Sequence, residues 1–207
     1  MLITLGIIGV VAAMTLPSLT GKYQQKVLES QFKKAYANIQ TAINKVNSEN
    51  GAPYECYTLV NGDGYSFAQC DIFWPKVLEE YKSSKFCESY DYSCRPHYKT
   101  KGEVLSAGGT IKNQSCSHPI GSMQGYNLND GSTLYLYKNP DEKGFNTHTS
   151  LYFGIDVNGK KGPNKWGYDL FYLNLYKRNE KSAVLGLTAV CELIEKGGQS
   201  AEEIMLK

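Results

Sequence analysis

The chain has 207 residues, of which 22 are basic and 20 acidic, giving a net charge of +2 at neutral pH. This length suits one domain with an added segment, and an apolar fraction of 42% excludes a disordered chain. Only Arg95 and Arg178 are arginines, so the sequence lacks the concentrated basic face of a duplex nucleic-acid binder and argues against nucleic acid as a partner.

Residues 1–19, MLITLGIIGVVAAMTLPSL, form an uncharged apolar run. As a helix rising about 1.5 Å per residue, the run would span about 28 Å, close to the thickness of a bilayer core. Its glycines and alanines would let helices approach closely in an apolar medium, and Pro17 is expected to kink or break the helix. The residues that represent this predicted membrane and filament helix are Leu2, Leu5, Gly6, Gly9, Ala13 and Pro17.

A cleaved secretory signal does not fit this run, because no basic region precedes it. Lys22, Lys26, Lys33 and Lys34 follow it, and by the positive-inside rule they would place the rest of the chain in the cytosol. The six cysteines favour an oxidising compartment instead. Both difficulties disappear if the natural start lies upstream of Met1 with a basic leader of its own, and we expect such a leader.

Helical patterning continues beyond the apolar run. A narrow apolar stripe recurs at spacings of three and four residues and consists of Leu28, Phe32, Ala35, Ile39, Ala42 and Val46. Asn50 and Gly51 supply a stop signal. The pattern predicts an N-terminal helical segment at residues 1–51, as one helix or as two separated between Pro17 and Gly21. The stripe predicts that the second half of this helical segment packs against a body formed by residues 52–207.

The segment LITLGIIGVVAAMTLPSL, together with the lysine- and glutamine-bearing helix after it, resembles the N-terminal helix of type IV pilins and type II secretion pseudopilins. In that family a membrane prepilin peptidase removes a basic leader that ends in glycine, and it methylates the new terminus. A phenylalanine and a glutamate follow that glycine; all three would precede Met1 and are missing from this chain. The resemblance implies three kinds of partner: other subunits packed through the N-terminal helix, the peptidase, and the membrane assembly machinery.

The sequence of the body predicts antiparallel strands with short helices. Strands are predicted at residues 132–137, 151–157 and 168–175, and a turn at residues 127–131 indicates a hairpin. Their apolar residues alternate as in half-buried strands, at Leu134, Leu136, Phe153, Ile155, Leu170 and Tyr172. Helices are predicted at residues 71–82, with Pro75 in the first turn, and at 189–195 and 201–206. The predicted fold is α+β and pilin-like, a long helix on an antiparallel sheet with disulfide-closed loops.

Six cysteines permit fifteen disulfide pairings. Cys87 and Cys94 lie close enough in sequence to close one loop, and we expect that pair. Cys56 with Cys70, and Cys116 with Cys191, are the remaining predicted pairs. A zinc site competes with this interpretation, with ligands drawn from Cys87, Cys94, His97, Cys116 and His118. It lacks the paired Cys-x2-Cys spacing of structural zinc, so disulfides are favoured.

The segment FGIDVNGKKGPNKWGYDLFYLNL resembles a strand pattern in the C-terminal body of some pilin-like proteins. It contains a set of oxygen-bearing side chains around a glycine-rich loop, namely Asp156, Asn158, Asn164 and Asp169. Calcium prefers six to eight such oxygens, and some pseudopilins bind calcium in a C-terminal loop, so these residues form a candidate calcium site. The same Asn-Gly and Gly-Pro-Asn sequences are also ordinary turn signals, and no cofactor other than calcium is indicated.

The tyrosine-rich stretch from Tyr81 to Tyr98 is either an exposed binding loop or a cap that covers the sheet and shields a disulfide. The cap is the favoured interpretation. No catalytic motif is present, and none of His97, His118 and His148 is marked as a base, so no enzyme activity is predicted.

The leading functional prediction is a structural subunit, a minor pilin or pseudopilin of a type IV pilus or type II secretion-like filament. It would cross the cytoplasmic membrane once, with its body outside the cytoplasm, and then join a filament or the cell surface. The alternatives are a membrane-anchored adhesion or ligand-binding module that does not polymerise, and a thiol- or zinc-dependent enzyme with a signal anchor.

Overall fold

The computed structural model describes the chain except residues 1, 60–63, 83–84, 115–118, 140, 142–143, 180–181 and 188–190. For residues 2–18, 85, 113 and 114 it describes the backbone alone. The helices are α1 (Leu2–Asn50), α2 (Cys70–Glu80), α3 (Lys101–Ser106) and α4 (Ala201–Met205), with short 3₁₀ turns η1 (Ile120–Ser122), η2 (His148–Leu151) and η3 (Gly159–Lys161). The strands are β1 (Tyr57–Leu59), β2 (Tyr65–Ser66), β3 (Lys85–Cys87), β4 (Thr110–Gln114), β5 (Gln124–Asn127), β6 (Thr133–Leu136), β7 (Tyr152–Asp156), β8 (Leu170–Asn179), β9 (Ser182–Gly186) and β10 (Cys191–Ile194).

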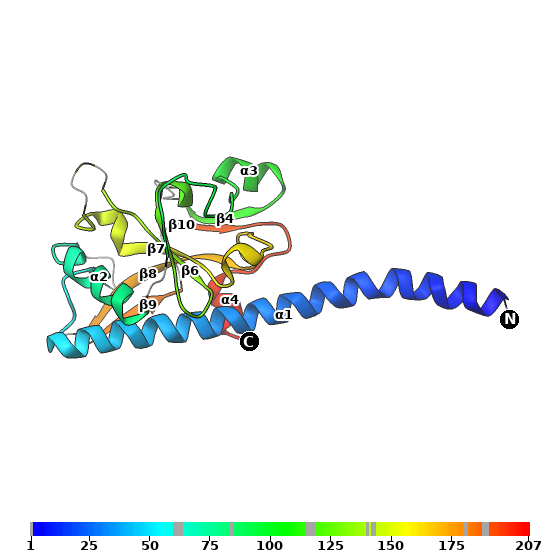
Figure 1. Cartoon of the computed structure of the whole chain (residues 1–207), viewed down its shortest axis with the longest axis horizontal. Helices are drawn as coiled ribbons and strands as arrows, with labels where there is room; N and C mark the ends of the chain where they lie inside the picture. The colour runs from blue at the N-terminus through cyan, green and yellow to red at the C-terminus, as the bar shows by residue number, and fades with distance from the viewer. Residues whose placement is uncertain are drawn as a thin grey trace.

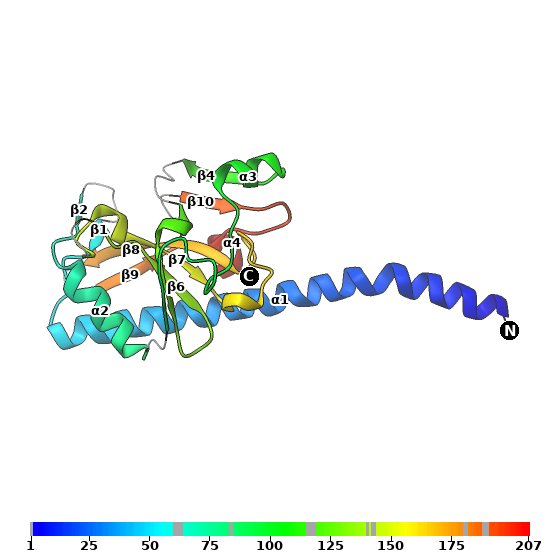
Figure 2. The same cartoon turned by 45° about the horizontal axis from the view of Figure 1, so that its top comes forward.

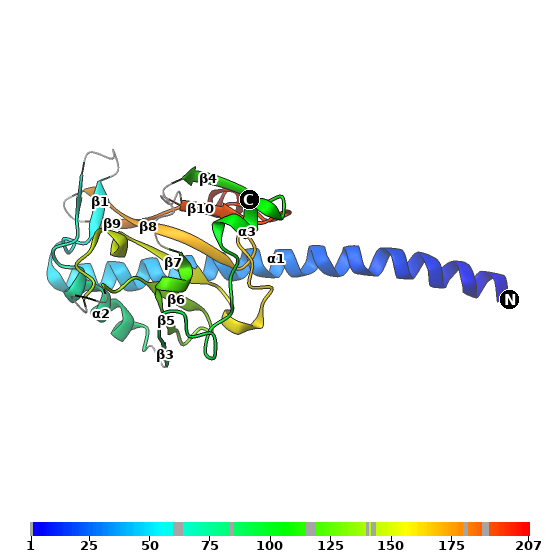
Figure 3. The same ribbon diagram turned by 90° about the horizontal axis from the view of Figure 1, so that it is seen from above.

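Helix α1 is continuous over 49 residues, so the alternative of two helices separated between Pro17 and Gly21 is wrong. Its second half lies along the body, and its first half extends beyond the body as a rod in every view (Figures 1, 2 and 3). The helix ends at Asn50, and Gly51 follows with a positive φ of 80°, the left-handed conformation typical of a residue after a helix.

The described residues form an eight-stranded sheet in the order β2-β1-β8-β7-β6-β5-β3, with β9 added to β8. Neighbours are antiparallel except β1 and β8, which run parallel. The ten-residue strand β8 is long enough to pair with β7 through its first half and with β9 and β1 through its second half. The hairpin predicted around residues 127–131 is confirmed as the β5–β6 connection.

Alternation along the central strands sends side chains to two different cores. Leu134 and Leu136, with Phe153 and Ile155, join the stripe of α1, whereas Tyr135 faces the other side. That opposite face is covered by α3, η1 and the separate β4–β10 pair, and its buried residues include Tyr152, Trp166, Leu170 and Tyr172. The prediction of half-buried strands is therefore wrong, because every residue of β6 and β7 is buried. Leu170 and Tyr172 also lie on the face opposite Leu134.

Two local predictions are wrong, and one short helix was not predicted. The segment predicted as a helix at residues 189–195 contains strand β10, which pairs with β4. Pro75 lies within α2 and not in its first turn, because the helix begins at Cys70. Helix α3 was not predicted, although Thr100 and Glu103 form a reciprocal capping box at its start, a signal present in the sequence. The helix predicted at residues 201–206 is confirmed as α4.

Candidate functional site

The apolar stripe of α1 is buried against the body. All six predicted residues, Leu28, Phe32, Ala35, Ile39, Ala42 and Val46, are at most 7% exposed. The Phe32 and Phe171 rings lie 4.4 Å apart between centroids, which joins the helix to the centre of the sheet. Since a buried aromatic ring contributes a few kcal/mol, this stripe fixes the helix on the body.

Gln40, beside the stripe, covers the free edge of the sheet. Its side-chain amide donates to the carbonyl oxygen of Ala183 (3.1 Å) and accepts from the backbone N–H of Leu185 (2.8 Å). The Tyr36 hydroxyl donates to the carbonyl of Leu185 (2.7 Å). Strand β9 pairs with β8 through its other edge, so α1 satisfies backbone groups that would otherwise invite another strand. Sequence reasoning missed this role because Gln40 lies off the apolar stripe.

The predicted membrane residues Leu2, Leu5, Gly6, Gly9, Ala13 and Pro17 belong to the first half of α1, and their side chains lie outside those that the structure describes. Among the residues that were described, no helix is both long and apolar enough to cross a membrane.

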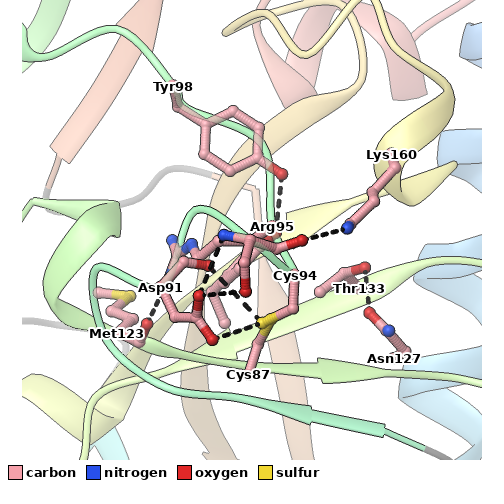
Figure 4. The surroundings of a disulfide bond; sticks show 11 residues. Cys87, Asp91, Cys94, Arg95, Tyr98, Met123, Asn127, Thr133 and Lys160 are labelled. Carbon is pink, nitrogen blue, oxygen red and sulfur yellow. Dashed lines mark hydrogen bonds between the residues drawn. A yellow bond between two sulfur atoms is a disulfide. The ribbon is translucent and has the colours of Figure 1, made fainter.

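Two disulfides are described in full, and both predicted pairings are confirmed. Cys56 is bonded to Cys70, with their Cα atoms 4.9 Å apart, and Cys87 to Cys94, at 6.0 Å. The second closes the loop drawn in Figure 4. Cys191 is also disulfide-bonded, and Cys116, its predicted partner, lies outside the described residues, as does His118. Cys87 and Cys94 are therefore not available as the thiolate ligands that the zinc interpretation required.

The four candidate calcium residues come together in the loop after β7. The Asp156 carboxylate accepts hydrogen bonds from the Tyr98 hydroxyl (2.7 Å) and from the backbone N–H of Asn158 (3.0 Å). The Asp169 carboxylate accepts from the backbone N–H groups of Asn164 and Lys165, each at 2.7 Å. Both carboxylates are fully buried, and these hydrogen bonds satisfy their oxygens. The same hydrogen bonds hold the loop in shape.

The fit of calcium to this loop is partial. The side-chain oxygens of Asn158 and Asn164 are buried and have no hydrogen-bond partner among the residues that the structure describes, which suits a hard cation that prefers oxygen ligands. Against this, the described residues contain no group of three or more histidine, cysteine, aspartate or glutamate side chains placed to hold a metal ion. Calcium at this loop stays a prediction. Asn158 also lines a groove of about 800 Å³ between the loop and the stretch of α1 from Gly21 to Gln31.

A buried polar network links the candidate calcium loop to the Cys87–Cys94 loop. The Tyr98 hydroxyl lies 2.8 Å from that of Tyr135, and the Arg95 guanidinium lies over the Tyr135 ring, 4.4 Å from its centroid. Burial, and next the nearby Asp169 charge, raise the pKa of Asp156 to about 7. Burial also raises the pKa of Asp169 and of Tyr98, and that of Tyr135 to about 12.

The tyrosine-rich stretch is buried at one residue and exposed at others. Tyr98 is buried and covers the sheet, which fits the cap, whereas Tyr90 and Tyr92 are about half exposed, at 55% and 48%. His97 and His148 are exposed, and their rings lie beside Tyr92 and Tyr65. Comparison with protein-family models, with curated proteins and with solved structures finds no match to this chain.

Proposed function

We propose that this chain is a structural subunit of a pilin-like filament, a minor pilin or pseudopilin of a type IV pilus or type II secretion-like assembly. Its first nineteen residues anchor it in the cytoplasmic membrane before assembly and pack against the same segment of other subunits afterwards. The body stays outside the cytoplasm and decorates the filament. The likeness in sequence to pilins and pseudopilins gives this proposal its particular family.

The observation that carries the proposal is the division of α1 into two halves. The second half is covered by the body, while the first extends beyond it as a rod (Figure 1). The sequence of that rod, up to Lys22, contains no charged residue. An uncharged apolar helix in water is costly, at about 25 cal/mol for each Å² of apolar surface, so lipid or other helices must cover it.

The disulfides support an extracytoplasmic body. Cys56–Cys70 and Cys87–Cys94 close loops that a reducing cytosol would tend to open. The small residues Gly6, Gly9 and Ala13 recur along the rod at spacings of three and four, the pattern that allows close helix packing without a hydrophobic driving force. Prepilin peptidase and a membrane assembly machinery are the further partners that the proposal requires, and no catalytic role is assigned.

The experiment that tests this proposal is the mass of the N-terminal peptide of the protein purified from its native cells. We expect a methylated terminus a few residues upstream of Met1, because prepilin processing would leave a phenylalanine and a glutamate before the apolar run. A signal-peptidase cut within residues 1–19, or an unmethylated terminus at Met1, would overturn the proposal.

The second candidate is a membrane-anchored binding module that does not polymerise. The half-exposed Tyr90 and Tyr92 rings favour it, because a purely structural body has no need to expose them. Cross-linking distinguishes the two candidates. A Val11→Cys variant expressed in the native cells should give disulfide-linked dimers if the rods pack together, and single chains if they do not. Leu105→Cys, on the exposed side of α3, is the matched control.

A further inference from the structure

A cavity of about 300 Å³ lies on the face of the sheet opposite α1. Tyr90, Tyr92 and Arg95 from the Cys87–Cys94 loop and the residues after it line one side. The other contributions come from the segment that leads into α3, from η1, and from Trp166 and Tyr172 of the second core. A cavity of this size, at the lower end of the range for ligand pockets, suits a ligand of one or two rings.

The two exposed rings at this cavity are held in place. Tyr90 has a φ of 58°, which is rare for a bulky residue, and its backbone N–H donates to the carbonyl of Gly121 (2.8 Å). A Cβ on Gly121 would lie 2.9 Å from the Tyr90 ring, so only glycine lets the ring lie against this backbone. The Tyr92 ring packs beside His97 at 5.0 Å. Backbone strain of this kind tends to persist where a binding site needs it.

The wall of the cavity carries a positive charge that has no counter-ion among the described residues. Arg95 is 3% exposed, and its guanidinium donates to the carbonyl oxygen of Met123 (Figure 4). It also donates to the carbonyl oxygen of Ile120. Within the described part of the chain its Nε has no hydrogen-bond partner, and no carboxylate there lies within ion-pair distance of the group. Lys99 is paired with Glu195 at 2.6 Å, whereas Lys101 is exposed at the rim. A buried unpaired charge is costly, and an anion in the cavity would offset part of that cost.

We propose that this cavity binds an acidic sugar, a pyranose ring that bears a carboxylate. The apolar C–H face of the ring packs on the tyrosine rings, as sugar faces do on aromatic planes, and the hydroxyls meet the polar rim of His97, Thr100 and Lys101. The carboxylate balances the positive charge of Arg95 and Lys101. The same charge disfavours cationic ligands. This inference does not depend on filament assembly.

The test uses the full chain in detergent solution and glucuronic acid as the probe, with binding measured by saturation-transfer NMR and calorimetry. We expect glucuronic acid to bind saturably and to bind more tightly than glucose. Tyr92→Ala should weaken binding of glucuronic acid at least about threefold, because it removes one aromatic platform. Tyr65→Ala is the matched control: Tyr65 is 56% exposed, lies on β2 and does not line the cavity, so binding should be unchanged.

A charge variant separates the two parts of the proposal. Lys101→Glu, at an exposed position, should weaken the binding of glucuronic acid several-fold, and by a clearly larger factor than it weakens the binding of glucose. Equal affinity for glucose and glucuronic acid would overturn the role of the charge. Equal affinity for an acidic dipeptide such as Gly-Glu would overturn the sugar. No saturable binding of glucuronic acid up to about 10 mM would overturn the site itself. None of these outcomes bears on the N-terminal processing, so the two proposals fail separately.

Discussion

Single buried residues decide how this body responds to pH, and Asp156 is the clearest case. Its carboxylate is fully buried, hydrogen-bonded to Tyr98 and close to a second buried carboxylate, Asp169. Such a group holds its proton to a higher pH in the folded chain than in the unfolded chain. The native state therefore binds more protons than the unfolded state between the two pKa values.

The folded pKa of Asp156 is about 7, against an unfolded value of about 3.9. Stability should therefore fall as the pH rises from about 4 to about 7, since the unfolded state binds fewer protons in that window. Asp156→Asn should reduce this fall, because an amide cannot ionise and its NH₂ group can donate to the Tyr98 hydroxyl. The measurement is the melting temperature at several pH values in EDTA.

Asp141→Asn is the control for this pH prediction, since Asp141 is exposed and should leave the pH dependence unchanged. Melting temperatures that rise between pH 5 and pH 7 in both the parent chain and Asp156→Asn would contradict the assignment.

At the scale of elements, the contact between α1 and β9 joins a helix to the open edge of a sheet. The Gln40 side chain provides both a donor and an acceptor to that edge, and its partners lie about 145 residues away in the chain. Apolar packing by the stripe holds the helix close, and these two hydrogen bonds fix its position along the strand. The edge that remains open to solvent is thereby shortened.

Gln40→Ala should lower the free energy of unfolding by about 1–3 kcal/mol, because it leaves the Leu185 N–H and the Ala183 carbonyl without partners. Urea denaturation of the two proteins measures the difference. Gln24→Ala, at an exposed position on the same helix, should change stability by less than about 0.5 kcal/mol. A loss as large in the control as in Gln40→Ala would show that the contact with β9 does not contribute.

At the scale of the whole molecule, the body and the rod have opposite requirements. The body buries its own core on both faces of the sheet, whereas the rod has no body to cover it (Figures 2 and 3). We therefore expect a chain that starts at Leu19 to be a folded monomer in water. The chain from Met1 should associate unless detergent is present. Light scattering after gel filtration distinguishes these outcomes, and a monomeric full chain in detergent-free buffer would contradict the expectation.

The parts of this fold that sequence could predict are those whose signal is local. The stripe from Leu28 to Val46 was predictable because its helical spacing is regular, and the Cys87–Cys94 pair because its partners are close in sequence. Strand β10 was not, since its apolar run suits a short helix equally well and its partner β4 lies far away. The second layer over the sheet was missed for the same reason, and with it the cavity beside Tyr90.

The continuous helix α1 also determines how the molecule resists mechanical force. A pull on the projecting end acts along the helix axis, so it loads the stripe and the Gln40 contacts in shear, and they must give way together. Soon after the helix ends, the Cys56–Cys70 disulfide fastens the chain to the start of α2. The far end of α1 is thus tethered covalently, and tension on the rod is passed to the body as a whole.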